Sequence, residues 1–243
     1  MPAKIDPLER PKRFYKAVTT GPVEGGFAVM LDGRTPKSPG GARLVVPAQG
    51  LADLIAAEWA RQGEFIIHGE MSATRLANTA LDNVPKARAA VAQEIADYAG
   101  SDALCYRADH PQALADREAA SWQPWLEWAA SDLGVALNST QGIVHVTQDA
   151  AALARVRDLA AELDDFSLSG LAFGTPLYGS SVLAFAVQRG ALGGEAAFDL
   201  SRLDQAFQEE KWGIDAEAAE RTARLRADAV MLGDWFASLS AAG

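Results

Sequence analysis

The sequence predicts an α+β protein, with a small antiparallel sheet and one helix at the N-terminus and a larger set of helices after it. Glycines and prolines punctuate the first 47 residues, and the segments between them alternate large and polar side chains, as short strands joined by turns do. After Pro47 the apolar residues recur at helical spacing instead. Hydrophobic residues make up 49% of the 243 residues, enough to bury a core, which excludes a disordered chain.

The N-terminal part contains the expected sheet. Alternation or apolar character predicts short strands at 13–20, 27–33, 42–47 and 64–71. Asp32-Gly33, at the end of the second strand, is a hairpin signal. One helix is expected from about 51 to 62. We expect these elements to form a domain of residues 1–75, followed by a helical domain of residues 76–243.

The remainder of the chain has mainly helical periodicity. Its breaks fall at glycines and at Pro85, and residues 141–147 are expected to form a short strand or an extended connection. The last helix carries a narrow apolar stripe from Ala218 to Leu239, which predicts packing within the bundle, or alternatively against a partner helix. The expected helices span about 72–82, 86–99, 111–133, 149–163, 167–174, 176–189, 195–210 and 215–239.

One apolar segment needs separate treatment because residues 166–188 contain no charge over 23 positions, a length that could cross a bilayer. Serines, glycines and a proline interrupt it, so we interpret it as buried core, with a partial interface as the open alternative. Thr175-Pro176 is typical of an N-cap followed by the first helical position, which predicts that the second helix starts there.

Charge is distributed unevenly along the chain. The sequence has 22 Lys and Arg against 32 Asp and Glu, a net charge of −10. Residues 1–75 carry a balance of +2, and residues 76–243 a balance of −12. Such an acidic region disfavours nucleic acid and membrane surfaces and favours a basic or amphiphilic protein partner. The N-terminus lacks the apolar core of a secretory signal, so we expect a cytoplasmic protein.

The chain shows no established enzyme motif. His68, His110 and His145 stand far apart and match no metal-binding pattern, and Cys105 is the single cysteine. The glycines in residues 190–194 are explained by a helix end and a linker rather than by a phosphate site. The sequence therefore favours a binding role over catalysis, with no cofactor, metal or small-molecule substrate.

Two further features are open to two interpretations. Glu209-Glu210 lies at the C-terminal end of an expected helix, where negative charge opposes the helix dipole. It is either a binding contact or a solvated face offset by Lys211. Three tryptophans at 122, 125 and 128 share one helix face, which predicts a core position, with protein recognition as the alternative.

Several motifs along nearly the whole chain occur in one order and resemble the Atp12 family of F1-ATPase assembly chaperones. The most specific is MSATRLANTALD at residues 71–82. The others are KRFYK at 12–16, LDGR at 31–34, EWARQ at 58–62, DALCYR at 102–107, WQPWLEW at 122–128, GL at 170–171 with SVLA at 181–184, and FQEEKWG at 207–213.

The resemblance implies an N-terminal α+β domain followed by an orthogonal helical bundle, and no enzymatic activity. It implies a bacterial cytoplasmic protein that binds the unassembled α subunit of F1-ATPase until the β subunit joins. Alternatives are a scaffold or adaptor with another partner, or an enzyme with a His/Glu site between the domains. The implied partner-binding residues are Asp204, Glu209, Glu210 and Lys211, and the implied structural residues are Trp59, Asn78, Thr79, Asp82, Trp212 and Gly213.

Overall fold

The computed structural model describes residues 11–213 and 216–241, which divide into two compact units. The first unit extends to Asn83 and also includes the chain from Ala237 onward; the second is Val84–Phe236. The sequence-based expectation placed the division at 75/76. The helix at 72–82 groups with the first unit because a glutamate of that unit binds its first turn, as described below.

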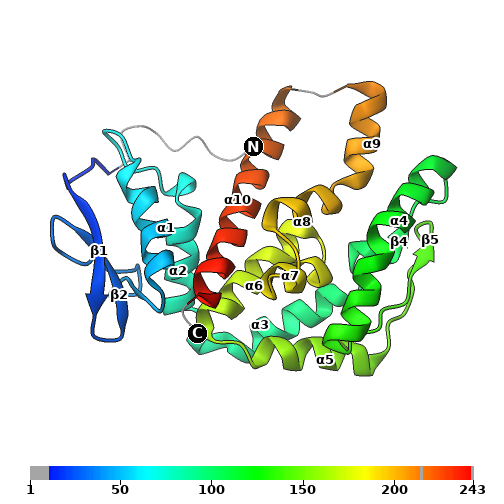
Figure 1. The fold of residues 1–243 in the computed structure, drawn as a ribbon, viewed down its shortest axis with the longest axis horizontal. Coiled ribbons are helices and arrows are strands. Elements are labelled where there is room, and N and C mark those ends of the chain that lie inside the picture. The colour runs from blue at the N-terminus through cyan, green and yellow to red at the C-terminus, as the bar shows by residue number, and fades with distance from the viewer. Residues whose placement is uncertain (1–10, 214–215, 242–243) are drawn as a thin grey trace. The chain divides into compact units, whose positions relative to one another are not determined.

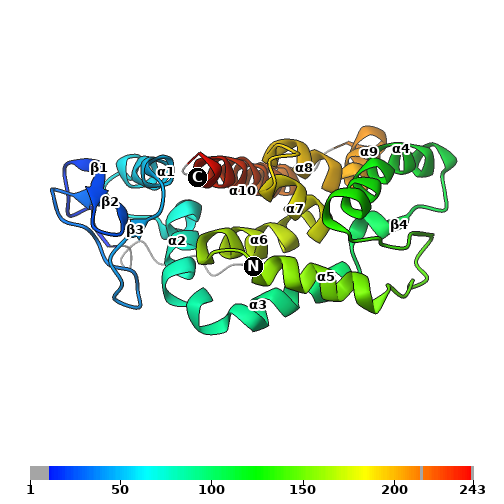
Figure 2. The ribbon, with the colours of Figure 1, turned by 60° about the horizontal axis from the view of Figure 1, so that its bottom comes forward.

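The first unit contains a three-stranded antiparallel sheet in the order β1-β2-β3, two of whose strands are labelled in Figure 1 and all of them in Figure 2. Gly26 begins β2 with a φ of 143°, and a Cβ there would lie 2.3 Å from the carbonyl oxygen of Val46, so this position requires glycine. The turn between β1 and β2 lies at Glu24-Gly25. Asp32-Gly33 forms a separate tight turn with positive φ at both residues. The strands are β1 (Val18–Val23), β2 (Gly26–Leu31) and β3 (Val45–Val46).

Two helices complete the first unit, α1 (Gln49–Ala60) and α2 (Ser72–Asp82), and α1 packs on β1 and β2. The buried Glu58 carboxylate on α1 accepts hydrogen bonds from the backbone N–H groups of Ala73 and Thr74, both at 2.8 Å, and so caps α2. The strand expected at 64–71 was wrong. Phe65 makes one β-bridge to Lys12, and the chain then forms a 3₁₀ turn, η2 (His68–Glu70). The Ile67 N–H donates a hydrogen bond to the Gln62 side-chain oxygen and is therefore not available for strand pairing.

The second unit is helical, with one short parallel pair of strands, β4 and β5. Helix α3 packs against α5 and α6 (Figure 2). The single helix expected at 195–210 is two helices, α8 and α9. The elements are α3 (Val84–Ala99), η3 (Ala103–Cys105), β4 (Tyr106–Arg107), α4 (Gln112–Trp128), η4 (Ala129–Leu133), β5 (Thr140–Gln141), α5 (Ala150–Ala161), α6 (Asp165–Tyr178), α7 (Ser181–Gln188), α8 (Gly194–Ser201), α9 (Leu203–Trp212) and α10 (Ala216–Ser240).

The uncharged segment forms α6 and α7, and the break between them corrects the prediction. It lies at Gly179 and Ser180, and Pro176 is inside α6. Gly179 has a φ of 61°, which ends α6, and the Ser180 hydroxyl accepts the Leu183 N–H and caps α7. Residues 181–187 of α7 are all buried. Within the described residues, no helix combines the length and apolar character needed to cross a bilayer.

Close packing joins α6 to α10 in the core of the second unit. A Cβ at Gly170 or at Gly174 would lie 2.7 Å from the side chain of Phe236 or Leu232, respectively, so both glycines allow α10 to approach. The apolar stripe predicted on α10 is thus buried at Ala229, Leu232 and Phe236, whereas Ala218 near its start is exposed.

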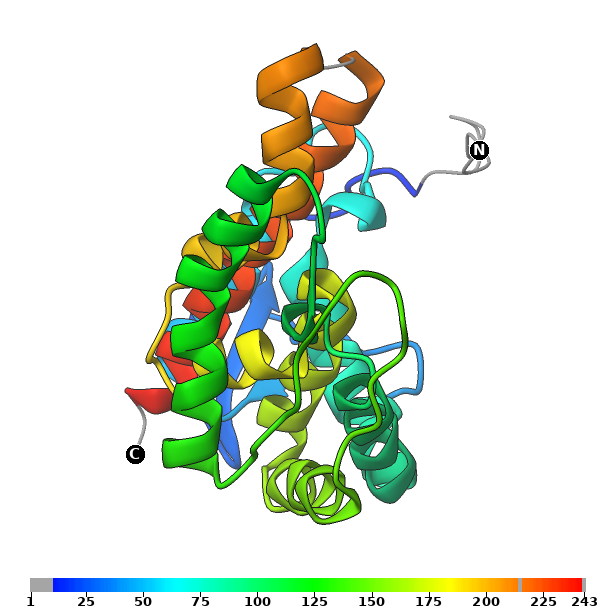
Figure 3. The same cartoon turned by 90° about the vertical axis from the view of Figure 1, so that its right-hand side faces the viewer.

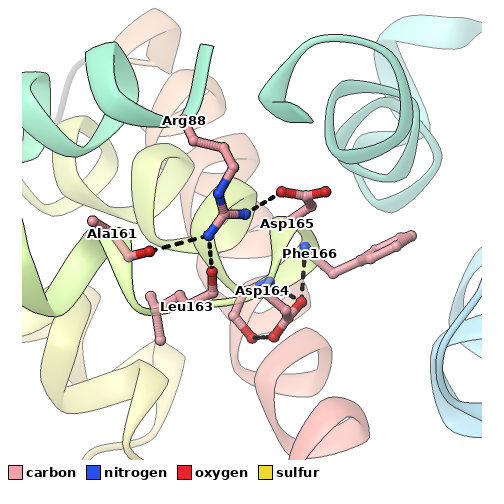
Figure 4. Close-up of polar contacts among 7 residues, drawn as sticks. Arg88, Ala161, Leu163, Asp164, Asp165 and Phe166 are labelled. Carbon is pink, nitrogen blue, oxygen red and sulfur yellow. Dashed lines mark hydrogen bonds and ion pairs between the residues drawn. The ribbon is translucent and has the colours of Figure 1, made fainter. Parts of the chain in front are cut away.

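Arg88 of α3 connects the end of α5 to the start of α6 (Figure 4). Its guanidinium pairs with the Asp165 carboxylate and donates to the backbone carbonyls of Ala161 and Leu163. The neighbouring Asp164 accepts the backbone N–H groups of Phe166 and Ser167 at 2.9 and 3.0 Å and so caps the N-terminus of α6. One arginine therefore satisfies carbonyls that the end of α5 leaves free.

Candidate functional site

One face of α4 provides the first wall of the candidate site. Leu114, Glu118 and Trp122 follow one another at intervals of four residues and therefore lie on one side of the helix. The Trp122 indole N–H donates to the carbonyl of Leu200 at 2.9 Å, which fixes this side chain at the base of the wall. A carboxylate thus lies between two large apolar side chains on the same face.

Helix α9 provides the opposite wall and lies beside the upper end of α4, orange and green respectively in Figure 3. The Arg117 guanidinium donates to both carboxylate oxygens of Glu210, at 2.8 and 3.1 Å, and lies over the Phe207 ring at 5.3 Å. Paired hydrogen bonds of this kind fix orientation as well as distance. Arg117 therefore holds the two helices in register.

The two walls enclose an open groove with a volume of about 600 Å³. The segment before α4 and the loop around Gly142 form its remaining sides. Two large apolar residues on its rim are exposed, Ile143 at 100% and Trp212 at 78%, beside the exposed polar residues Asp109 and His110. Large apolar side chains gathered at a hollow are typical of a binding surface. From α9, the groove is lined by Asp204, Gln205, Phe207, Gln208, Lys211 and Trp212.

Glu118 is the unusual group in this groove, since the residue is only 2% exposed. Its carboxylate accepts the backbone N–H of Ala108 at 2.6 Å. Burial raises the pKa of Glu118, and the negative charge of Asp204 raises it further, while Arg107 acts in the opposite direction. The Asp204 carboxylate of α9 therefore acts on the Glu118 carboxylate of α4.

The structure separates the expected partner-binding residues into two groups. Asp204 and Lys211 line the groove. Glu209 pairs with Arg202 at 3.0 Å, and Glu210 with Arg117, so both of these acids already have an intramolecular partner. The Lys211 ammonium lies 4.1 Å from the centre of the Phe207 ring. Acidic residues at the end of α9 are thus offset by arginines rather than by Lys211.

The expected structural residues also differ among themselves. Trp212 lies exposed on the groove rim, and Gly213 follows it with a φ of 83°. The others belong to the first unit. Trp59 is buried and its carbonyl accepts the Tyr15 hydroxyl at 2.7 Å.

The three expected structural residues on α2 make different contacts. Asp82 accepts the Ser38 hydroxyl and the Gly40 N–H at 2.6 and 2.7 Å, which ties α2 to the loop before β3. The Thr79 hydroxyl donates to the Arg75 carbonyl within the helix. Asn78 is half-buried, and no hydrogen bond of its side chain is found among the described residues. Asp82 is therefore the polar anchor of this helix.

Sequence reasoning missed Glu118 and Ile143. The signal for Glu118 was present, since an acidic residue four positions from both Leu114 and Trp122 interrupts an apolar helix face. Ile143 gave no signal, because its role depends on where the loop before α5 lies. The core position expected for the three tryptophans is confirmed for Trp122, whereas Trp125 and Trp128 are half-buried.

The histidines and the cysteine have local partners or are inert. The Nδ1 atom of His110 lies 2.6 Å from the Asp109 carboxylate, and that of His145 lies 3.0 Å from the Tyr106 hydroxyl. Cys105 is buried, and burial raises the pKa of its thiol to about 12. The thiol is therefore protonated and unreactive at neutral pH.

Comparison with known proteins gives consistent matches. A family model described as "ATP12 chaperone protein" matches residues 12–130. The chain is 26% identical over 228 residues to "Protein atp12, mitochondrial" of Schizosaccharomyces pombe, covering 88% of this chain and 78% of that protein. The crystal structure of Atp12 from Paracoccus denitrificans is similar with a TM-score of 0.84 and 39% identity, over 93% of this chain and 97% of that one. A structure from Agrobacterium tumefaciens is similar with a TM-score of 0.86 and 38% identity, over 94% and 86% of the two chains.

Proposed function

The chain belongs to the ATP12 family of chaperone proteins, and from this premise we propose that it assists assembly of the F1 part of ATP synthase by binding the unassembled α subunit. The bacterial origin of the two similar solved structures agrees with action in a bacterial cytoplasm. The client surface would be the one that the α subunit later presents to β.

The groove between α4 and α9 is the observation that supports this proposal. A subunit that has not yet met its partner exposes an apolar surface, and such surfaces aggregate. Ile143 and Trp212 offer exposed apolar area of matching character at the groove rim. Asp204 and Lys211 supply polar contacts beside it. The chaperone would cover the client surface, and the β subunit would displace it by competing for the same area.

Co-purification with the cognate F1 α and β subunits tests the function. We expect the immobilised chaperone to retain α alone and to release it when β is added. Retention of neither subunit by folded chaperone would refute α binding, and retention of an unrelated protein instead would favour the adaptor alternative.

The groove is tested by replacing its exposed apolar rim with polar residues. We expect the double variant Ile143→Ser, Trp212→Ser to retain at least tenfold less α subunit, with a melting temperature close to that of the wild type because both side chains are exposed. Val230→Ser is the matched control, since Val230 is an exposed apolar residue on α10 that does not line the groove. Equal loss in the control would argue against the groove as the contact.

A further inference from the structure

Helix α4 places a buried carboxylate, that of Glu118, in the wall of the groove. A surface that makes only apolar contacts would not require this carboxylate. Glu118 occupies the same face as Leu114 and Trp122, and it is as buried as they are. Burying an ionised carboxylate is costly unless a cation or several hydrogen bonds compensate it. A single backbone N–H, that of Ala108, is its hydrogen-bond donor in the described part of the chain.

Arg107 and Lys211, which line the groove, make no ion pair with Glu118. Arg107 donates to the Gln123 side chain, and the Lys211 ammonium lies on the Phe207 ring. Asp204 accepts a hydrogen bond from Gln208 at 3.0 Å. Across residues 11–213 and 216–241, neither Glu118 nor Asp204 takes part in an ion pair, in contrast to Glu209 and Glu210. Arg107 attracts Glu118 at longer range, but neither the Glu118 nor the Asp204 carboxylate has an ion-pair partner within the described chain.

We propose that the groove receives a basic side chain of an otherwise apolar client segment, and that this arginine or lysine inserts between Glu118 and Asp204. The segment around it is apolar because the rim at Ile143 and Trp212 and the inner wall at Phe207 are apolar. A guanidinium suits the site best, since it is planar, weakly hydrated and has enough N–H donors for two carboxylates. The inference rests on the proposed function in assigning this segment to the unassembled α subunit.

The site also separates correct from incorrect client segments. A segment with a neutral residue at this position would leave both carboxylates without a partner, and one with an acidic residue would add a third negative charge. Glu118 thus acts as a specificity determinant, whereas Ile143 and Trp212 supply apolar contact area that accepts many sequences.

A peptide experiment tests the site without the α subunit. The probes are two capped peptides of about ten residues, made of alanine and leucine around one central arginine or, in the second, around its neutral isostere citrulline. We expect titration calorimetry to show the arginine peptide binding at least tenfold more tightly, and NMR to show shifts of the Trp122 and Trp212 indole N–H groups. The double variant Glu118→Gln, Asp204→Asn should bind both peptides equally. Equal binding of the two peptides to the wild type, or absence of binding, would overturn the inference.

A second arm uses the α subunit and the same variant. Glutamine at 118 keeps an oxygen for the Ala108 N–H, so we expect an unchanged fold, checked by the melting temperature, and at least tenfold weaker retention of α. Asp116→Asn is the control for the substitution on α4, because it removes one negative charge from the exposed face of the same helix. Wild-type retention by the double variant would refute the inference and leave the proposed function intact. If the wild type binds the arginine peptide more tightly than the citrulline peptide but retains no α subunit, the proposed function would be refuted instead.

Discussion

At the scale of single residues, the role of an acidic side chain depends on what faces it. Glu209-Glu210 was notable in the sequence because it opposes the dipole of α9, yet Arg202 and Arg117 offset both charges. Glu118 was overlooked in the sequence, and it is the buried carboxylate of the groove. A test that replaces Glu209 and Glu210 by lysine would therefore break two internal ion pairs as well as any client contact.

The Arg117–Glu210 pair should stabilise the protein in a pH-dependent manner. Hydrogen bonding from Arg117 lowers the pKa of Glu210 below its ordinary value of 4.5. An acid whose pKa is lower in the folded state than in the unfolded state stabilises the fold at pH values above the unfolded-state pKa. This contribution is lost as the pH falls through the lower, folded-state pKa. We expect Glu210→Gln to melt below the wild type at pH 6, and the difference to shrink as the pH drops below about 4.5.

The matched control for that prediction is Glu220→Gln. Glu220 pairs with Arg224 within α10, and both side chains are largely exposed, so the pair joins no two helices. Its replacement should change the melting temperature little at any pH. A difference between wild type and Glu210→Gln that persists at low pH would contradict the ion-pair explanation.

At the scale of elements, sequence patterns placed most helices but missed several ends. The predicted limits of α2, residues 72–82, agree with the structure. The end of α6 was missed because Thr175-Pro176 is typical of the start of a helix. The helix tolerates Pro176 on an exposed face, and the left-handed Gly179 followed by the Ser180 cap provides a better boundary. The segment 64–71 does not form a strand, because the Ile67 N–H donates to the Gln62 side-chain oxygen instead of to a neighbouring strand.

The contact between α8 and α10 should make Gly194 intolerant of any side chain. A Cβ at Gly194 would lie 2.0 Å from the carbonyl oxygen of Ala229, on the backbone of α10. We expect Gly194→Ala to push the helices apart and to lower the free energy of unfolding by about 1–3 kcal/mol, measured by urea denaturation. The adjacent Gly193→Ala is the control, because its Cβ would meet nothing within 4 Å and its φ of −72° suits alanine. Equal effects of the two substitutions would contradict the packing argument.

At the scale of the whole molecule, the sequence predicted the α+β class and the family, because both depend on patterns spread along the chain. The groove could not be predicted in the same way. It needs α4, α9 and the loop at Gly142 to meet, and the pairing of Arg117 with Glu210 joins positions 93 residues apart. Periodicity identifies the apolar face of each helix but not which face of another helix lies opposite.

The net charge of −10 should also govern how fast a basic client associates. Opposite charges accelerate diffusional encounter, and salt screens them over roughly 10 Å at 0.1 M. We therefore expect the association rate with the α subunit, followed by surface plasmon resonance, to fall several-fold when the salt concentration is raised tenfold. An unchanged rate would show that apolar contact alone controls the encounter.

The inert state of Cys105 has a practical consequence. The chain has one cysteine, and it is buried with its thiol protonated at neutral pH. A maleimide dye or a photoactivatable cross-linker will therefore react only with a cysteine introduced on the surface. Ile143→Cys would put such a label on the rim of the groove without first removing the native thiol. The protein is thus ready for mapping, residue by residue, of whatever occupies the groove during assembly.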